Sequence, residues 1–112
     1  MIKVSVLYAN KPGARFDHGY YREKHVPLIA ARLGSTLRFY EIDKGIAGDA
    51  PGTPAPFVAI VHLFSESLET FQAGFGPHAE EIIADIRTFT DVQPIMQVSE
   101  VVVVSSAERN LQ

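Results

Sequence analysis

The sequence predicts an α+β fold, in which an antiparallel four-stranded sheet carries two helices on one face in the ferredoxin-like order β-α-β-β-α-β. Four segments have the alternation or the β-branched composition of strands, and longer segments with helix start and stop signals follow the first and the third of them. A chain of 112 residues with 46% hydrophobic content can bury one core. We therefore predict a single domain over residues 1–105 and a polar tail over residues 106–112.

The first strand and the first helix are separated by the turn sequence NKPG. Residues 2–9 alternate with the two-residue period of a strand and are rich in β-branched side chains. Asp17 fits the N-cap of the following helix, and Phe16 and Tyr21 are spaced as a hydrophobic staple around it. We expect this helix to end at Gly34.

The middle of the chain predicts two strands joined by a loop or hairpin crossing. Residues 35–46 alternate as a strand, and residues 57–64 are almost all apolar, as in a strand covered on both faces. Between them, residues 47–56 contain three prolines and two glycines. This composition is typical of a turn region.

The last part of the chain predicts a second helical region and a fourth strand. The helical region begins near Ser65 or Ser67 and continues towards Arg87, with an interruption at the Gly-Pro pair of the sequence GFGPH. The fourth strand covers residues 95–104.

The two apolar strands predict that the sheet is covered on its second face as well. Residues 57–64 and 101–104 place apolar side chains in both directions, whereas the helices cover only one side. Since a large exposed apolar patch on a small protein is an association site, we predict a symmetric homodimer built sheet on sheet.

Composition excludes several classes of partner and chemistry. The chain has 10 basic and 13 acidic residues, a net charge of −3 and no basic run, which argues against nucleic acid as a partner. There is no apolar stretch long enough for a membrane span and no signal peptide at the start, so we expect a cytoplasmic protein. The absence of cysteine leaves histidine, carboxylate, tyrosine and serine as the chemical groups.

Four histidines are candidates for a functional role. His18 is expected to face solvent in the first turn of the first helix, and His78 follows a helix start, where it could serve as a neutral donor. His62 lies on an apolar strand and requires a partner or a cavity. His18 and His25 are seven residues apart, about 10 Å along a helix, too far to share one ion, so we predict no metal site.

His25 has the most informative surroundings. Tyr21 precedes it by four residues, so that the two rings are neighbours on a helix. Pro27 follows it by two residues, withholds an N–H group from the carbonyl of Glu23 and loosens the helix at this turn. This pattern favours an imidazole aimed at a pocket over a simple helix end.

Three segments of the chain resemble the EthD family, named for ethyl tert-butyl ether degradation. They are FDHGYYREKHVPLIAARLG, PAPFVAIVHLFSESLETF and ADIRTFTDVQPIMQVSEV, and the match covers nearly the whole chain. The resemblance implies a dimeric α/β barrel, which agrees with the homodimer inferred from the apolar strands. It implies a site in the cleft between helices and sheet, lined by Tyr8, Tyr21, His25, His62, His78 and Phe89.

Three functions are compatible with these residues and with the resemblance. The first is an isomerase, cyclase or decarboxylase without a cofactor, acting on a small apolar or aromatic compound with His25 as general acid or base and Tyr8 or Tyr21 as an oxyanion donor. The second is a non-catalytic protein that binds a small hydrophobic molecule or assists an oxygenase in a degradation pathway. The third is a haem binder with a histidine ligand.

Overall fold

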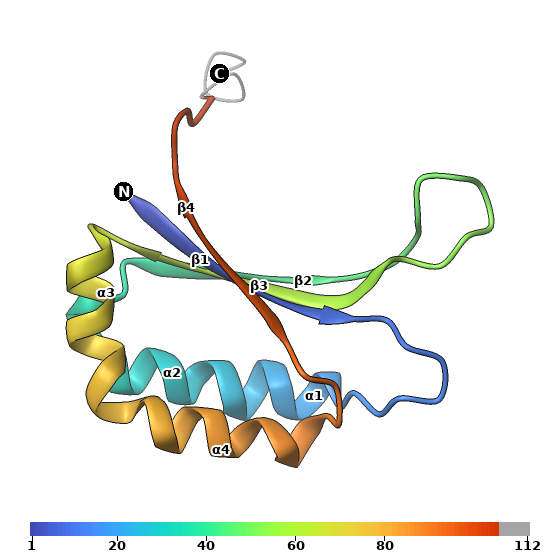
Figure 1. Cartoon of the computed structure of the whole chain (residues 1–112), viewed down its shortest axis with the longest axis horizontal. Coiled ribbons are helices and arrows are strands. Elements are labelled where there is room, and N and C mark those ends of the chain that lie inside the picture. The colour runs from blue at the N-terminus through green and yellow to red at the C-terminus, as the bar shows by residue number, and fades with distance from the viewer. Residues whose placement is uncertain (106–112) are drawn as a thin grey trace.

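The computed structural model describes residues 1–105 and contains one four-stranded antiparallel sheet with a helical layer on one side (Figure 1). The strands lie in the spatial order β2-β3-β1-β4 and comprise β1 (Ile2–Ala9), β2 (Phe39–Lys44), β3 (Phe57–Ser65) and β4 (Ile95–Glu100). The helical layer comprises α1 (His18–Tyr20), η1 (Tyr21–His25), α2 (Val26–Leu33), η2 (Gly34–Thr36), α3 (Leu68–Phe75), η3 (Gly76–His78) and α4 (Ala79–Phe89). The predicted ferredoxin-like fold is confirmed.

Strand register determines which side chains face the helices. Val4 lies opposite both Leu63 and Val98, so these residues share the helix-facing side of the sheet. Alternate residues along β1 and β3 therefore form the sheet half of the core. The core is completed by buried apolar residues of the helices, which include Tyr21, Val26, Ile29, Leu33, Phe71, Ile82 and Phe89.

The first helix contains a wider turn at its centre. Asp17 accepts a hydrogen bond from the backbone of Tyr20, as expected of an N-cap, and Gly34 ends the helix with a positive φ of 55°. Between them, η1 is a π-helical turn, in which the Val26 N–H donates to the carbonyl of Tyr21. Pro27 cannot supply the N–H of a regular α-helical ladder, and the π turn ends two residues before it, at His25.

The second helical region is divided as the sequence predicts. Ser67 caps α3 by accepting a hydrogen bond from the backbone of Thr70, so Ser67 rather than Ser65 begins the helix. A short 3₁₀ turn at the Gly-Pro pair separates α3 from α4. Figure 1 shows α4 lying alongside α2 beneath the sheet.

Two predicted strands are shorter in the structure. β2 begins at Phe39 because Gly34–Thr36 forms a 3₁₀ turn. β4 ends at Glu100, which pairs with Ile2 in β1, and one further hydrogen bond joins the Val101 N–H to the carbonyl of Met1. The predicted polar tail at residues 106–112 lies outside the described residues.

The second face of the sheet carries no helix in residues 1–105 (Figure 1). Its side chains include Leu7, Phe39, Ile60, Phe64 and Ile95, but polar residues such as Ser5, His62 and Gln97 lie among them. This face is less apolar than the sequence predicts, because the valines after Glu100 lie beyond the sheet. Within residues 1–105, no helix has the length and apolar composition needed to cross a bilayer.

Close packing of α3 against η2 yields a prediction for Gly74. A Cβ atom at Gly74 would collide with the side chain of Thr36, so we expect Gly74→Ala to destabilise the fold by about 1–2 kcal/mol despite the better helix propensity of alanine. Gly19→Ala is the matched control, because its Cβ would meet only ordinary contacts, and it should stabilise slightly. Urea unfolding of both variants tests the expectation, and equal stabilities would contradict it.

Candidate functional site

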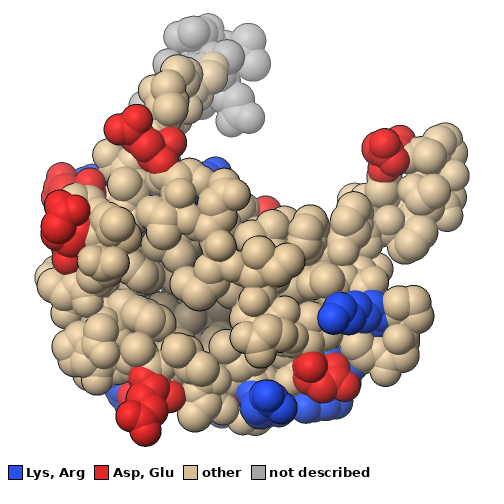
Figure 2. Space-filling view, viewed as in Figure 1, with Lys and Arg blue, Asp and Glu red and all other residues tan. Residues whose placement is uncertain are grey.

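A small apolar cavity of about 50 Å³ lies between the helical layer and the sheet. It is lined by side chains from β1, β3, β4 and the helices: Val6, Tyr8, Tyr21, His25, Ile29, Val61, Leu63, Phe71, Phe75, Ile82, Ile83, Ile86, Pro94 and Met96. In Figure 2 the surface between the sheet and α4 is hollowed and tan, and Lys, Arg, Asp and Glu lie towards the edge of this face. Two of the lining residues, Ile83 and Met96, are more than half exposed.

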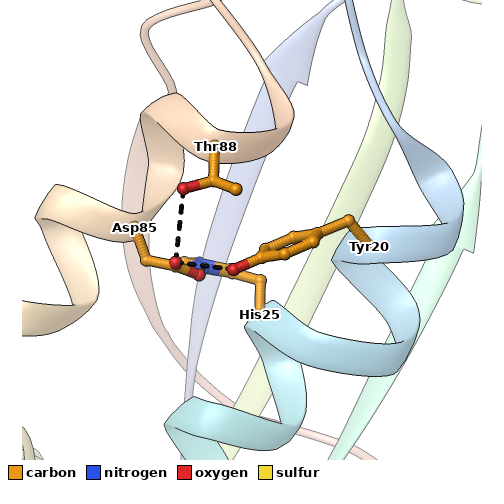
Figure 3. A network of polar contacts seen from close by, with 4 residues as sticks. All are labelled: Tyr20, His25, Asp85 and Thr88. Carbon is orange, nitrogen blue, oxygen red and sulfur yellow. Dashed lines mark hydrogen bonds and ion pairs between the residues drawn. The ribbon is translucent and has the colours of Figure 1, made fainter.

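Among the described residues that line this cavity, His25 is the only titratable group other than tyrosine. It lies at the end of the π turn, and only 2% of the residue is exposed. Its Nδ1 atom is 2.9 Å from Oδ2 of Asp85, which projects from α4 (Figure 3). A hydrogen bond thus joins the two main helices beside the cavity.

Asp85 is itself held in place by further hydrogen bonds. The Tyr20 hydroxyl donates to Asp85 Oδ1 at 2.8 Å, and Thr88 donates to the same oxygen at 3.4 Å (Figure 3). Since a carboxylate only accepts hydrogen bonds, Nδ1 of His25 carries the proton that is shared with it. Nε2 of the neutral ring is then the atom with a free lone pair.

Burial and hydrogen bonding set the charge states of this pair. Burial lowers the pKa of His25 below its ordinary value, although the hydrogen bond and the charge of Asp85 oppose the shift. Burial raises the pKa of Asp85, but hydrogen bonds from His25 and Tyr20 outweigh it and leave the pKa below the usual value. At neutral pH the pair is therefore a neutral imidazole beside a carboxylate, as a general base requires.

Two buried tyrosines complete the polar part of the cavity wall. Tyr8 and Tyr21 are each 1% exposed, and burial raises the pKa of both hydroxyls, so that they remain protonated. The Tyr21 ring stacks on His25 with a centroid separation of 5.9 Å. Its hydroxyl is buried without a hydrogen-bond partner among the described residues. A ligand that supplies an acceptor to this hydroxyl is bound more tightly, because a buried hydroxyl without a hydrogen bond is costly in free energy.

The structure brings together four of the six residues that the resemblance implied. Tyr8, Tyr21 and His25 line the cavity. Phe89 packs behind them, with its ring centroid 4.5 Å from that of His25, and does not line the cavity itself.

His62 and His78 do not belong to this group. Val61 and Leu63 face the helices, so the strand period turns His62 to the other face of the sheet, where Ser5 and Asp43 bond to it at 2.8 and 3.2 Å. His78 precedes α4, about 10 Å along the helix from Asp85, and is not part of the cavity lining. The expectation that these two residues line the cleft is therefore corrected.

Sequence reasoning missed Asp85 and Tyr20. A signal for Asp85 was present, because it lies three residues after Ile82 and four before Phe89, which places a carboxylate on the apolar face of a helix. Tyr20 had no comparable signal. Among the described residues, no cluster of three or more His, Asp or Glu side chains is arranged to hold a metal ion.

The fold and this cavity define a ferredoxin-like α+β protein with an imidazole–carboxylate pair at an apolar cavity. The EthD domain model matches residues 14–93, a range that contains His25 and Asp85. The structure of an EthD-like protein from Ralstonia eutropha JMP134 is 47% identical, with a TM-score of 0.90 over 95% of this chain and 96% of that chain. The chain therefore belongs to the EthD family.

More distant structures share the fold. An EthD family protein from Bacillus halodurans C-125 is 18% identical, with a TM-score of 0.67 over 89% of this chain and 97% of that chain. A protein from Arabidopsis thaliana is 16% identical, with a TM-score of 0.66 over 94% and 99% of the two chains. No match was found among curated proteins.

The hydrogen bond to Asp85 gives a prediction for the titration of His25. Asp85 raises the pKa of His25 against the effect of burial, so Asp85→Asn should lower that pKa further. The neutral ring then persists to lower pH than in the unchanged protein. A ¹⁵N NMR titration of the imidazole measures the shift. Thr88→Val is the control with a small expected effect, because its hydrogen bond to Asp85 is long, and an unchanged or raised pKa in Asp85→Asn would contradict the prediction.

Proposed function

We propose that this protein is an acid–base catalyst that needs no cofactor and acts on a small, apolar or aromatic carbonyl compound. The observation that carries the proposal is the hydrogen bond from His25 to Asp85 at the wall of an apolar cavity. A neutral, oriented imidazole in such a place is suited to proton transfer. The family membership supports a shared site but does not specify a reaction.

The geometry supports proton transfer at carbon beside a carbonyl group. Nε2 of His25 would take a proton from that carbon, and the electron pair would move to the carbonyl oxygen. The Tyr21 hydroxyl, which has no partner among the described residues, would donate to the resulting enolate oxygen. Where the enolate is conjugated with a double bond, return of the proton from His25 to the far carbon of that system gives an isomerisation. Attack of the enolate carbon on a second carbonyl of the same molecule, whose oxygen then takes the proton from His25, gives a cyclisation.

Asp85 has a supporting role in this scheme. It holds Nδ1 and so keeps Nε2 unprotonated, and its negative charge stabilises the imidazolium that forms after proton transfer. The Tyr20 hydroxyl holds the other carboxylate oxygen, Oδ1. Asp85 therefore positions His25 and does not itself touch the substrate.

The cavity restricts the choice of substrate. Its volume of about 50 Å³ admits a small ligand, and a larger one enters only if side chains at the opening move. Met96 is unbranched and more than half exposed, which makes such movement inexpensive.

A non-catalytic role in binding is the second candidate. The apolar lining supports capture of a small hydrophobic molecule whether or not a reaction follows, with His25 and Tyr21 orienting the ligand. Binding without conversion distinguishes this role from catalysis, for example in a protein that assists an oxygenase.

Hydrogen–deuterium exchange tests the catalytic proposal without knowledge of the substrate. We expect the protein to accelerate exchange of the protons beside the carbonyl of cyclohexanone or phenylacetone in D₂O, and His25→Gln to reduce the acceleration about 10²–10⁴-fold. Proton NMR of the ketone follows the reaction. His78→Gln is the matched control, because this histidine lies outside the cavity lining and should leave the rate unchanged. Ketone binding with no exchange above that of His25→Gln would favour the binding role.

We also propose that the protein is a homodimer formed through the helix-free face of its sheet. Phe39 is 46% exposed on this face and stacks on Phe64, and Ile95 is 57% exposed at the same surface. Exposed apolar side chains of this size support association with a second copy. A structure described as a dimeric ferredoxin-like protein, from Thermobifida fusca, has the same fold at 14% identity and a TM-score of 0.53.

A charge placed at the centre of the helix-free face should separate the dimer. Ile60 lies on this face opposite Leu7, and each copy would contribute one Ile60 to the symmetric interface. Ile60→Lys should therefore raise the dimer Kd by at least about thirtyfold, as loss of a central contact does. Analytical ultracentrifugation measures the effect. Ile46→Lys in the exposed β2–β3 loop is the control, and a monomeric unchanged protein would refute the dimer.

A further inference from the structure

A second pocket, distinct from the apolar cavity, lies between the first helix and the edge strand β2. It has a volume of about 260 Å³ and is lined by His18, Tyr21, Arg22, Tyr40, Ile42 and Lys44. Tyr21 is the one described residue that borders both this pocket and the apolar cavity. The function proposed above leaves this pocket unused.

Three basic side chains from two separate segments converge on this pocket. His18 and Arg22 come from the first helix and Lys44 from the end of β2, and no acidic side chain of residues 1–105 belongs to the lining. Arg22 has one exposed ion pair, with Glu23 at 3.4 Å, and no ion pair within residues 1–105 involves Lys44. This local excess of positive charge occurs in a chain whose net charge is −3.

The basic groups are close enough to act on one another. Burial lowers the pKa of His18, and the charges of Lys44 and Arg22 lower it further, whereas Asp17 acts in the opposite direction. The ring of Phe16 also packs against His18, with a centroid separation of 4.7 Å. Repulsion among cations is relieved when an anion enters between them.

The remaining wall residues suit an organic ligand. Tyr40 is 38% exposed and presents an aromatic ring in the pocket wall beside Ile42 and the basic groups. An arginine can bind an oxyanion through two parallel N–H donors of its planar guanidinium group, and a lysine adds the compact positive charge of its ammonium group. An aromatic wall next to them favours a ligand whose anionic group is attached to a flat or apolar body.

We propose that this pocket is a binding site for a small organic oxyanion, held by Arg22, Lys44 and His18 with its apolar part against Tyr40. The site is separate from the proposed reaction at His25 and does not depend on it. A carboxylate on an aromatic ring is the simplest ligand of this class.

Benzoate and benzamide provide a matched pair of probes, because they differ mainly in the negative charge. We expect benzoate to bind with chemical-shift changes at Tyr40 and Ile42 in ¹⁵N NMR spectra at constant ionic strength, and benzamide to bind at least about tenfold more weakly. The double variant Arg22→Gln, Lys44→Gln should lose at least about tenfold in benzoate affinity. Lys11→Gln, Lys24→Gln removes the same charge from exposed positions outside the pocket and should retain the affinity.

The pH dependence provides a second readout. Protonated His18 adds a positive charge, so benzoate affinity should rise as the pH falls through the range in which His18 titrates, and His18→Gln should remove this rise. Equal binding of benzoate and benzamide, shifts confined to other residues, or equal losses in the two double variants would overturn the proposal. His25→Gln should leave benzoate affinity unchanged, which separates this site from the one at the cavity.

Discussion

The hydrogen bond between His25 and Asp85 joins the two halves of the helical layer, and the proposed chemistry depends on it. His25 and Asp85 are 60 residues apart in the sequence and belong to different helices, since His25 lies in η1 and Asp85 in α4. Burying the imidazole without a hydrogen-bond partner would cost free energy, and burying the carboxylate without one would cost more. Their pairing satisfies both groups and leaves one ring nitrogen for a ligand. The same contact that holds the helices together therefore also prepares the site.

The π turn explains how His25 reaches this position. A regular α-helix through Pro27 would lose a hydrogen bond and force a clash at the preceding turn. The chain instead widens over Tyr21–His25, and both ends of this turn are buried. The free-energy cost of the irregular backbone is confined to this turn. In return, the Tyr21 and His25 rings lie side by side. Single π-helical turns within helices are frequently found at functional sites.

Much of the fold follows from local signals in the sequence. The Asp17 cap, the Gly34 stop and the Ser67 cap each give a helix boundary, because one side chain or one backbone conformation determines it. The late start of β2 reflects a local 3₁₀ turn, whereas the early end of β4 concerns a contact between distant segments. The end of β4 depends on where β1 begins, which no local pattern records.

In the candidate site, too, features within one helix were predictable, whereas contacts between separate elements were not. His25 and Tyr21 were predictable because both belong to one helix and their spacing is visible in the sequence. Asp85 and Tyr20 were missed because their hydrogen bonds link separate elements. His62 was assigned to the wrong surroundings, since alternation along a strand separates two faces but does not say which one the helices cover.

The strand order has a consequence for how the chain acquires its structure during synthesis. β1 emerges first but lies inside the sheet, and its two neighbours are β3 and β4. Such distant pairings give a high contact order, which slows folding. β1 can pair with β3 once that strand has been made, but its other edge stays unpaired until β4 has left the ribosome, so protection of this edge by chaperones matters more here than in a protein with local pairings.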